Sequence, residues 1–463
     1  MNLKKKVFTV LFSALLIGGL AACSSGGNDA SKGSTDTEAD KGMEVLGENV
    51  KFDPNKLVNE GEPITIEYWS WNEGDPTIPL AKEYEKIYPN VKIKVVQTPW
   101  DDYFTKLPLA LKGKEGPAIF NVHNSNHDIL FPYMAPYDIP TEDLQADFTS
   151  VDSHIIDGKV YYIDSVINTG NFYYNKKLWS EAGLTEADIP KTWDQLREVA
   201  KKLTKEENGK ITQAGFNYNG ETYSALYEGM NYQDGTLLFK DNGTTANYDN
   251  QTSIDNMQFL VDLYEKDKVG SKDFGAESAQ SFGNGQSAMV YKWGWFLNEL
   301  ETNYSDIDYG VFPTPTPSEE VPFAYDRFNG ESTPGINKNQ TEEQQAVAQD
   351  FLTYLLANDD YSKQAALSLV SFPTKKALAE DKDILENPVL NAIAPRVERL
   401  IWPGPFPSTV ETTATQTMED VLFNGKDIKA AIKDGQAKME AEMKGKDFTS
   451  LESDYPYYDE AKK

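Results

Sequence analysis

The sequence predicts an α/β protein with at least two lobes. Strand-like and helix-like segments alternate along the chain, which is the pattern of a sheet covered by helices. The first such series, within residues 64–122, has the order strand, helix, strand, helix, strand. The chain has 463 residues, which is more than one ordinary hydrophobic core accommodates. These three observations together favour two separate cores.

The N-terminus predicts a lipoprotein signal peptide over residues 1–22. Residues 4–6 are lysines, and residues 7–20 form an apolar stretch that is too short for an ordinary membrane span. The sequence LAAC at residues 20–23 matches the bacterial lipobox, in which the cysteine receives a diacylglycerol and becomes the new N-terminus. Cys23 is the only cysteine, so it forms no internal disulfide, and a lipid explains its presence. An ordinary secretory cleavage site is the alternative interpretation.

The residues after Cys23 predict a tether. Residues 24–41 are rich in Ser, Gly, Asp and Thr and poor in apolar side chains, so they cannot build a core. We therefore expect a lipid-anchored flexible tether over residues 23–60. Such an anchor would hold the protein on a membrane and not within it.

The composition excludes some ligand classes. The formal net charge is −29, and no basic stripe interleaved with aromatic residues occurs, so nucleic acid is not an expected partner. The same charge argues against an anionic ligand that is held by charge alone. The chain contains 25 Tyr, 22 Phe and 8 Trp residues. This aromatic content suits a site that stacks on sugar rings, although most of these rings are expected in the cores.

The first series of elements places two loops beside each other. We expect strands at residues 64–69, 91–96 and 118–122 and helices at residues 78–87 and 102–111. In a sheet of this order, ligand-binding loops lie at the carboxyl ends of the strands. The loops in question are residues 70–75 and 123–128.

Later segments predict further helices and a strand that enters a proline-rich connector. Thr192 suits a helix N-cap, and Gln195 stands at the capping-box position, before apolar residues at helical spacing. The strand is expected at residues 309–313, and the connector runs to residue 317. Other helices are expected at residues 254–265, 344–356, 362–369 and 430–444.

Five short motifs carry a resemblance to a known family. They are DGKVYY at 157–162, YYNKKLWSEAGL at 173–184, PKTWDQLREVAKKLT at 190–204, FGNGQSAM at 282–289 and VLFNGKDIKAAIKDGQAKME at 421–440. Their joint order, more than any single motif, resembles that of the family 1 extracellular solute-binding proteins, the sugar-capturing subunits of ABC importers. The resemblance covers nearly the whole chain after the signal peptide.

This resemblance implies a two-lobed fold like that of periplasmic binding proteins. Each lobe would be a sheet flanked by helices, with the ligand cleft at the hinge. Chain crossings between the lobes are then expected near residues 163–170, 311–317 and 370–373. The expected domains are a signal peptide (1–22), a tether (23–60), lobe 1 (61–165 and 316–370), lobe 2 (166–315 and 371–455) and a C-terminal tail (456–463).

The resemblance also implies a function. The protein would capture a sugar or oligosaccharide by hinge closure and deliver it to the permease subunits of an ABC importer. It would act as a monomer, without enzymatic activity, cofactor or metal, anchored to the outer face of a bacterial cell membrane through Cys23. The acidic composition fits a phosphorylated ligand poorly. The length and linkage of the sugar stay open.

Candidate ligand contacts on the first lobe follow its first and third predicted strands. Trp71 offers an aromatic face for a sugar, or packs under its own loop, and it is followed by the polar residues Asn72 and Glu73. The position after the third strand matches the family position for hydroxyl-binding groups, and it holds His123, Asn124, Asn126 and Asp128. His123 and His127 have the i, i+4 spacing of a metal pair on a helix. The asparagine-rich context predicts a loop and no third ligand is evident, so we expect no metal there.

Candidate contacts on the second lobe rest on the resemblance. Glu221 and Tyr223 resemble the acidic and aromatic pair of maltose-type members. Trp295 occupies the place after the Ala-Met pair where the family often has a sugar-stacking tryptophan, and its neighbour Trp293 could take that role instead. The remaining candidates are Arg327, Asn329 and Glu331, near the expected cleft mouth, and Trp402, a candidate lid.

Two other function classes are compatible with parts of the sequence. A secreted glycoside hydrolase would carry aromatic residues and a carboxylate pair, but 73 acidic residues supply such pairs by chance. A surface lipoprotein for adhesion or scaffolding is the other class, which the absence of internal repeats does not favour. The sequence contains no nucleophile elbow, phosphate loop or metal-ligand cluster.

Overall fold

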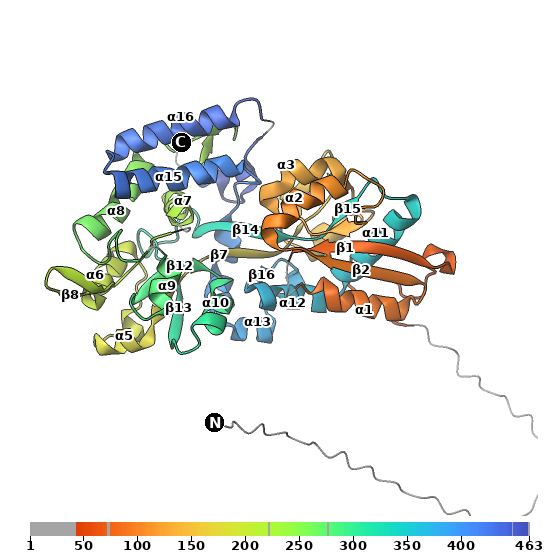
Figure 1. The fold of residues 1–463 in the computed structure, drawn as a ribbon, viewed down its shortest axis with the longest axis horizontal. Helices are drawn as coiled ribbons and strands as arrows, with labels where there is room; N and C mark the ends of the chain where they lie inside the picture. Colours follow the sequence, from red (N-terminus) through yellow and green to blue (C-terminus); the bar gives the residue numbers. More distant parts are fainter. Residues whose placement is uncertain (1–42, 72–74, 221–222, 276, 447, 462–463) are drawn as a thin grey trace, which may run out of the picture. The chain divides into compact units, whose positions relative to one another are not determined.

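Two separate β-sheets organise the chain. The computed structural model describes residues 43–71, 75–220, 223–275, 277–446 and 448–461. Cys23, and the signal peptide and anchor predicted around it, therefore lie outside the described residues. Each sheet has its own helices and its own hydrophobic core (Figure 1). The α/β class with two lobes is thus confirmed.

The first sheet has the strand order β2-β1-β3-β15-β4. β1 (Ile64–Ser70) pairs in parallel with β2 (Val91–Gln97) and β3 (Ile119–Phe120), whereas β15 (Gly335–Asn337) is antiparallel to β3 and to β4 (Met134–Ala135). The main helices of this lobe are α1 (Thr77–Ile87), α2 (Trp100–Ala110) and α11 (Glu342–Ala357). All elements predicted within residues 64–122 are present, with ends displaced by at most two residues.

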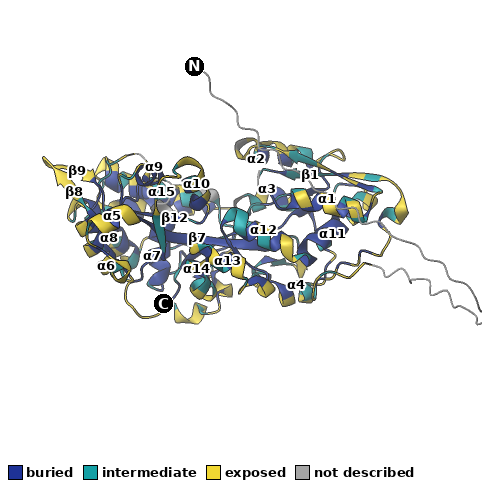
Figure 2. Ribbon diagram, turned by 90° about the horizontal axis from the view of Figure 1, so that it is seen from below, coloured by how far each residue is buried: buried dark blue, intermediate teal, exposed yellow. Residues whose placement is uncertain are grey.

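The second sheet is organised around β7 (Asp164–Asn175), whose 12 residues are all buried (Figure 2). The early part of β7 pairs with β14 (Asp326–Ser332) and β16 (Phe372–Pro373), and its last part pairs with β12 (Met289–Trp293) and β13 (Tyr309–Pro313). All these pairings are antiparallel, and β17 (Leu400–Ile401) extends the sheet beside β14. Successive side chains of β7 face opposite cores, so Phe172 joins one cluster and Tyr173 the other.

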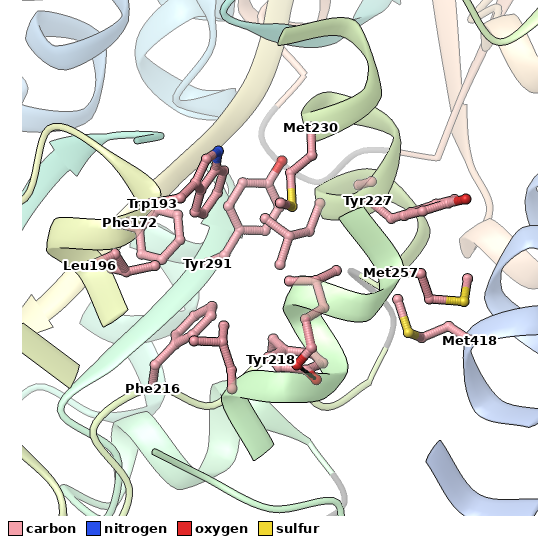
Figure 3. Close-up of a cluster of buried hydrophobic side chains, with 14 of the residues drawn as sticks. Phe172, Trp193, Leu196, Phe216, Tyr218, Tyr227, Met230, Met257, Tyr291 and Met418 are labelled. Atoms are coloured by element: carbon pink, nitrogen blue, oxygen red, sulfur yellow. Dashed lines mark hydrogen bonds between the residues drawn. The ribbon is translucent and has the colours of Figure 1, made fainter. Parts of the chain in front are cut away.

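The larger core of the second lobe is rich in aromatic side chains. Figure 3 shows Phe172 of β7 among Trp193 and Leu196 of α6 (Trp193–Leu203), Phe216 and Tyr291. The Phe172 ring centroid lies 5.2 Å from that of Phe216 and 5.6 Å from that of Tyr291. These contacts hold α6 against one face of the second sheet.

The start of α6 confirms the predicted capping box. The Thr192 hydroxyl accepts a hydrogen bond from the Gln195 backbone N–H, and Gln195 Oε1 accepts one from the Thr192 backbone N–H, both at 3.3 Å. The apolar residues at helical spacing are buried, as expected. Here the sequence correctly predicted both the first turn of the helix and its buried face.

Further helices and short hairpins complete the lobes. The helices are α3 (His127–Leu130), α4 (Thr141–Asp147), α5 (Lys176–Glu181), α7 (Tyr223–Gln233), α8 (Gln251–Glu265), α9 (Ser278–Gly283), α10 (Phe296–Asn303), α12 (Asp359–Leu369), α13 (Lys382–Glu386), α14 (Pro388–Ile393), α15 (Ser408–Asn424) and α16 (Ile428–Met443). The hairpins are β5 (Ile155–Ile156) with β6 (Lys159–Val160), β8 (Lys205–Glu207) with β9 (Lys210–Gln213), and β10 (Phe239–Lys240) with β11 (Thr245–Ala246). The later helices and the strand predicted from the sequence are confirmed as α8, α11, α12, α16 and β13. None of the helices in the described part of the chain is long and apolar enough to cross a membrane.

The described chain changes sheets at three places. The first lies at the start of β7, because Ile163 packs in the core of the first lobe and Val166 in that of the second. The second lies at residues 333–334, between β14 of the second sheet and β15 of the first. The third runs along α12, which leads from α11 to β16.

The crossing expected near residues 311–317 is wrong. This segment forms β13 and then stays on the second lobe, where Gln233 Nε2 donates a hydrogen bond to the Pro315 carbonyl at 2.8 Å. Phe323 and Ala324, which we expected in lobe 1, pack in the larger core of the second lobe. The prolines indicated an extended chain correctly, but that chain is bound to the surface of one lobe.

The expected tether is also too long at its C-terminal end. Phe52 is fully buried, and its ring centroid lies 5.1 Å from that of Tyr354 on α11. The Val50 backbone N–H donates a hydrogen bond to Asp147 Oδ2 at 2.8 Å. Residues 43–60 therefore pack on the first lobe, because a few apolar side chains are sufficient to bind an otherwise polar segment.

The expected C-terminal tail likewise begins too early. Arg399 forms an ion pair with Glu460 at 3.2 Å, and its guanidinium carbon lies 3.7 Å from the Tyr457 ring centroid. Ala461 packs against the core of the second lobe. The segment up to residue 461 is thus part of the second lobe.

Candidate ligand-binding site

Side chains from both lobes line a pocket of about 300 Å³. The first lobe contributes the residues that follow β3, and the second contributes β7, β12, β14, α7, α15 and the segment before α15. The lining residues are His123, Asn124, Asn168, Ala225, Trp293, Trp295, Arg327, Asn329, Glu331, Trp402, Gly404, Pro405, Phe406 and Glu411. The pocket thus brings together eight of the residues that the sequence suggested as ligand contacts.

β14 positions three of the polar side chains. Arg327, Asn329 and Glu331 occupy alternate positions of this strand, so they project from the same face of the sheet. His123 of the first lobe forms an isolated antiparallel bridge with Glu331. This bridge brings the two lobes together at the edge of the pocket.

The two neighbouring tryptophans differ in how they are held. Trp295 stands at the N-cap of α10 with 37% of its surface exposed, and Lys292 Nζ lies 5.6 Å from its ring centroid. Trp293 is half-buried against the larger core of the second lobe, and the guanidinium carbon of Arg327 lies 5.2 Å from its ring centroid. Trp295 therefore offers the more accessible indole face.

Arg327 is held by two carboxylates. Its Nε forms an ion pair with Glu228 Oε2 of α7 at 3.0 Å, and its Nη2 donates a hydrogen bond to Glu411 Oε1 of α15 at 2.8 Å. The Arg327 side chain is only 8% exposed. Burial alone would lower the pKa of Arg327, but Glu228 and Glu411 raise it, so the guanidinium stays charged.

Two buried carboxyl groups lie beside Arg327 with perturbed titration. Burial raises the pKa of Glu228 to about 7, against the opposing effects of Arg327 and of the Tyr248 hydroxyl, which donates to Glu228 Oε1 at 2.6 Å. Burial also raises the pKa of Asp326 to about 7, although it accepts hydrogen bonds from Tyr291 and Thr314 at 3.1 Å. Both groups therefore titrate near neutral pH.

Two of the lining residues also have structural contacts. Asn124 Nδ2 donates to the Gly330 carbonyl at 2.9 Å, and its Oδ1 accepts from the Ser332 hydroxyl at 3.0 Å, so this amide joins the first lobe to β14. Trp402 is 7% exposed and lies between the rings of His154 and Phe328, with centroids at 4.9 and 6.2 Å. Trp402 therefore forms a fixed wall of the pocket.

Trp71, Asn126 and Asp128 are sequence candidates that are not among the residues lining this pocket. Trp71 packs edge-on against Trp100 and Tyr103, with centroid distances of 5.2 and 5.1 Å. Asn126 and Asp128 line a neighbouring pocket of about 560 Å³, which shares Trp402 with the first. Tyr223 begins α7. The candidates that lie outside the described residues are Asn72, Glu73, Glu221 and Cys23.

His127 of the first lobe is half-buried beside aromatic side chains. Burial and the nearby His154 lower the pKa of His127 to about 4, and its Nδ1 lies 2.8 Å from the Tyr162 hydroxyl. The His127 ring stacks on Phe131 at 5.0 Å. Among the residues that the structure describes, no group of three His, Cys, Asp or Glu side chains could hold a metal ion.

Several lining residues were not predicted from the sequence. They are Asn168, Ala225, Gly404, Pro405, Phe406 and Glu411. Asn168 lies inside a buried strand, where an asparagine is unusual, so its position in the strand is the sequence signal for it. Glu411 lies in the first turn of α15, where an acidic residue has an ordinary structural explanation.

Comparisons with known proteins support the two-lobed fold. Residues 68–361 match the family model described as bacterial extracellular solute-binding protein. The chain is 24% identical to the maltodextrin-binding protein of Bacillus subtilis over 441 residues, covering 92% of this chain and 93% of that protein. It is 25% identical to the maltotriose-binding protein of Pyrococcus abyssi over 378 residues, covering 79% of each chain. The crystal structure of the cyclic alpha-maltosyl-1,6-maltose binding protein from Arthrobacter globiformis has the same fold, with a TM-score of 0.67 and 20% identity over 83% of this chain and 100% of that one.

Proposed function

The chain belongs to the bacterial extracellular solute-binding proteins, and from this premise we propose that it captures a sugar or oligosaccharide outside the cell and delivers it to an ABC import permease. The observation that carries the proposal is the pocket itself. It places the exposed face of Trp295 among the polar side chains of His123, Asn329 and Glu331, drawn from both lobes. An aromatic face suits the C–H surface of a sugar ring, and planar polar groups suit its hydroxyls.

The relatives support an oligosaccharide as the ligand. The two curated relatives described above bind maltotriose and maltodextrin by name, and a further relative in Bacillus subtilis, 22% identical over 344 residues, is an arabinooligosaccharide-binding protein. These proteins differ in their sugars, so the linkage and length stay open for this chain. The family and these relatives are binding proteins, and we propose no reaction at the pocket.

Hinge closure is the mechanism that we propose for capture. A ligand that contacts both lobes binds more tightly when the lobes meet, so it shifts the population toward the closed form. The residues at the three chain crossings would absorb the change in backbone angles. The permease would then recognise the two lobes in their closed arrangement.

Trp295→Ala should weaken sugar binding by about 1–3 kcal/mol, because the variant loses the aromatic face beneath a sugar ring. Its melting temperature without ligand should change little, since the indole is 37% exposed. A thermal-shift screen of mono- and oligosaccharides would identify a ligand, because binding to the native state raises apparent stability. Calorimetry would then compare wild type, Trp295→Ala and Trp293→Ala. Unchanged affinity in both variants would reject a stacking role on this lobe, and no ligand in the whole screen would reject the sugar.

We further propose that Cys23 carries the lipid anchor. Cys23→Ala should abolish lipidation, so that the protein either escapes to the medium or keeps an uncleaved signal peptide. Cell fractionation and mass spectrometry of the N-terminal peptide would check this. The proposal fails if the variant is processed normally and retained at the membrane while the wild type carries no acyl mass.

A further inference from the structure

We propose that Glu411 makes this pocket selective for uncharged sugars, by neutralising the guanidinium of Arg327 that an anionic ligand would otherwise use. This inference rests on the proposed sugar-binding function and adds the substrate class. Arg327 is the only guanidinium or ammonium group among the described residues that line the pocket. The acidic side chains of Glu331 and Glu411 line the same pocket.

The positive charge of Arg327 already faces carboxylates. Its Nη2 lies 2.8 Å from Glu411 Oε1, its Nε lies 3.0 Å from Glu228 Oε2, and its guanidinium carbon lies 5.2 Å from the Trp293 ring centroid. A phosphate or carboxylate on a ligand would bind Arg327 only by displacing Glu411 or by approaching it closely. The second case places like charges side by side, which is unfavourable at a partly desolvated site.

Glu411, more than Glu228, supplies the neutralising charge. Glu228 is fully buried and accepts a hydrogen bond from Tyr248, and burial raises its pKa to about 7, so it is partly protonated at neutral pH. Glu411 has 46% of its side chain exposed, at the N-terminal turn of α15. The Glu411 carboxylate is therefore open to the pocket that it lines, whereas Glu228 is enclosed in the lobe.

Neutral sugars avoid this repulsion, and their hydroxyl groups can donate hydrogen bonds to the same carboxylates. Carboxylates accept hydrogen bonds from hydroxyl groups, so Glu331 and Glu411 can bind an uncharged sugar directly. The same two side chains repel phosphorylated sugars and uronates. The geometry therefore assigns the pocket to neutral sugars and makes Glu411 a specificity-determining residue.

Glu411→Gln tests this assignment directly. The glutamine oxygen can still accept a hydrogen bond from Arg327, so the variant removes the charge and keeps the contact. The matched control is Glu419→Gln, which removes an exposed charge from the same helix away from the pocket. Two pairs of probes share a sugar skeleton and differ in the anionic groups that it carries, maltotriose with maltotriose 6-phosphate and galactotriose with trigalacturonate. Their dissociation constants would be measured by calorimetry at low ionic strength, where charge effects are least screened.

Wild type and Glu419→Gln should both bind the neutral member of a pair at least about tenfold more tightly than the anionic member. In Glu411→Gln this ratio should fall at least about fivefold, with melting temperatures showing that the fold is kept. The inference is overturned if wild type binds both members of a pair equally, or if Glu411→Gln leaves the ratio unchanged, or if Glu419→Gln lowers it as much. Binding of neither neutral probe, together with no hit in the wider sugar screen, would overturn the proposed function itself.

Discussion

Replacing Arg327 with methionine should lower the free energy of unfolding by about 3–5 kcal/mol, the cost of leaving a buried charge without its partner. Glu228 is fully buried, and its Oε2 lies 3.0 Å from Arg327 Nε. The variant therefore leaves this buried carboxyl without its cationic partner inside the second lobe. Methionine keeps an unbranched side chain beside Trp293, which separates the loss of charge from a loss of packing. Urea denaturation at pH 8, where Glu228 of the wild type is mostly ionised, would measure the effect.

Two further variants locate the cause of this loss. Glu228→Gln in the Arg327→Met background should restore part of the stability, because the buried position no longer holds a charge. Lys176→Met breaks an ion pair with Asp308 in which the two side chains are 49% and 74% exposed, so it should cost less than about 1 kcal/mol. If Arg327→Met costs no more than Lys176→Met, the buried network does not stabilise the fold.

The protein should be several kcal/mol less stable at pH 8 than at pH 5. Burial raises the pKa values of Glu228, Asp326 and Glu452 to about 7, from ordinary values of 4.5, 3.8 and 4.5. The folded state therefore binds more protons than the unfolded state across this window, and stability falls as these protons leave. Each carboxyl should contribute a loss of about 2–3 kcal/mol, from about 1.4 kcal/mol per unit of pKa difference.

The titration of His127 has the opposite effect on stability over part of this pH range. Its pKa is lowered from 6.5 to about 4, so the unfolded state binds the extra proton and stability rises with pH up to about 6.5. This gain of about 2 kcal/mol is smaller than the summed loss from the three carboxyls. The net slope should therefore be negative.

Denaturation curves at pH 5, 6.5 and 8 would measure this slope. Glu452 is not among the residues that line the ligand pocket, and it accepts hydrogen bonds from Tyr232 at 2.7 Å and from the Leu238 backbone at 2.7 Å. Glu452→Gln should thus reduce the net slope by about 40–50% without altering ligand binding. A stability that rises steadily from pH 5 to pH 8 would contradict the argument.

Local patterns in the sequence predicted much of the fold. The alternation within residues 64–122 and the capping box at Thr192 depend on neighbouring residues only, and both are present in the structure. Arg327, Asn329 and Glu331 were proposed together from the family resemblance, as part of a loop, whereas the structure places them on one face of strand β14. Local patterns are reliable because the backbone geometry of a helix or strand determines on which face each side chain lies.

Contacts between distant residues could not be predicted in this way. Glu411 meets Arg327 across 84 residues of sequence, and a glutamate in a helix is usually solvated, so nothing marked it as a pocket residue. The same reason explains Phe52, which lies in a polar segment and yet is buried against Tyr354. In both cases tertiary packing, and not local preference, decided the position.

The central strand β7 also determines when the protein can fold during its synthesis. Its partners emerge from the ribosome late, since Thr169 of β7 donates a hydrogen bond to Arg327 across 158 residues and β16 ends at Pro373. The first sheet also cannot be completed early, because β15 lies between β3 and β4 in its strand order. Pairings of such large sequence separation form slowly, so neither lobe can close its sheet while translation is still producing the first 330 residues. The chain that emerges during this time therefore has neither sheet complete.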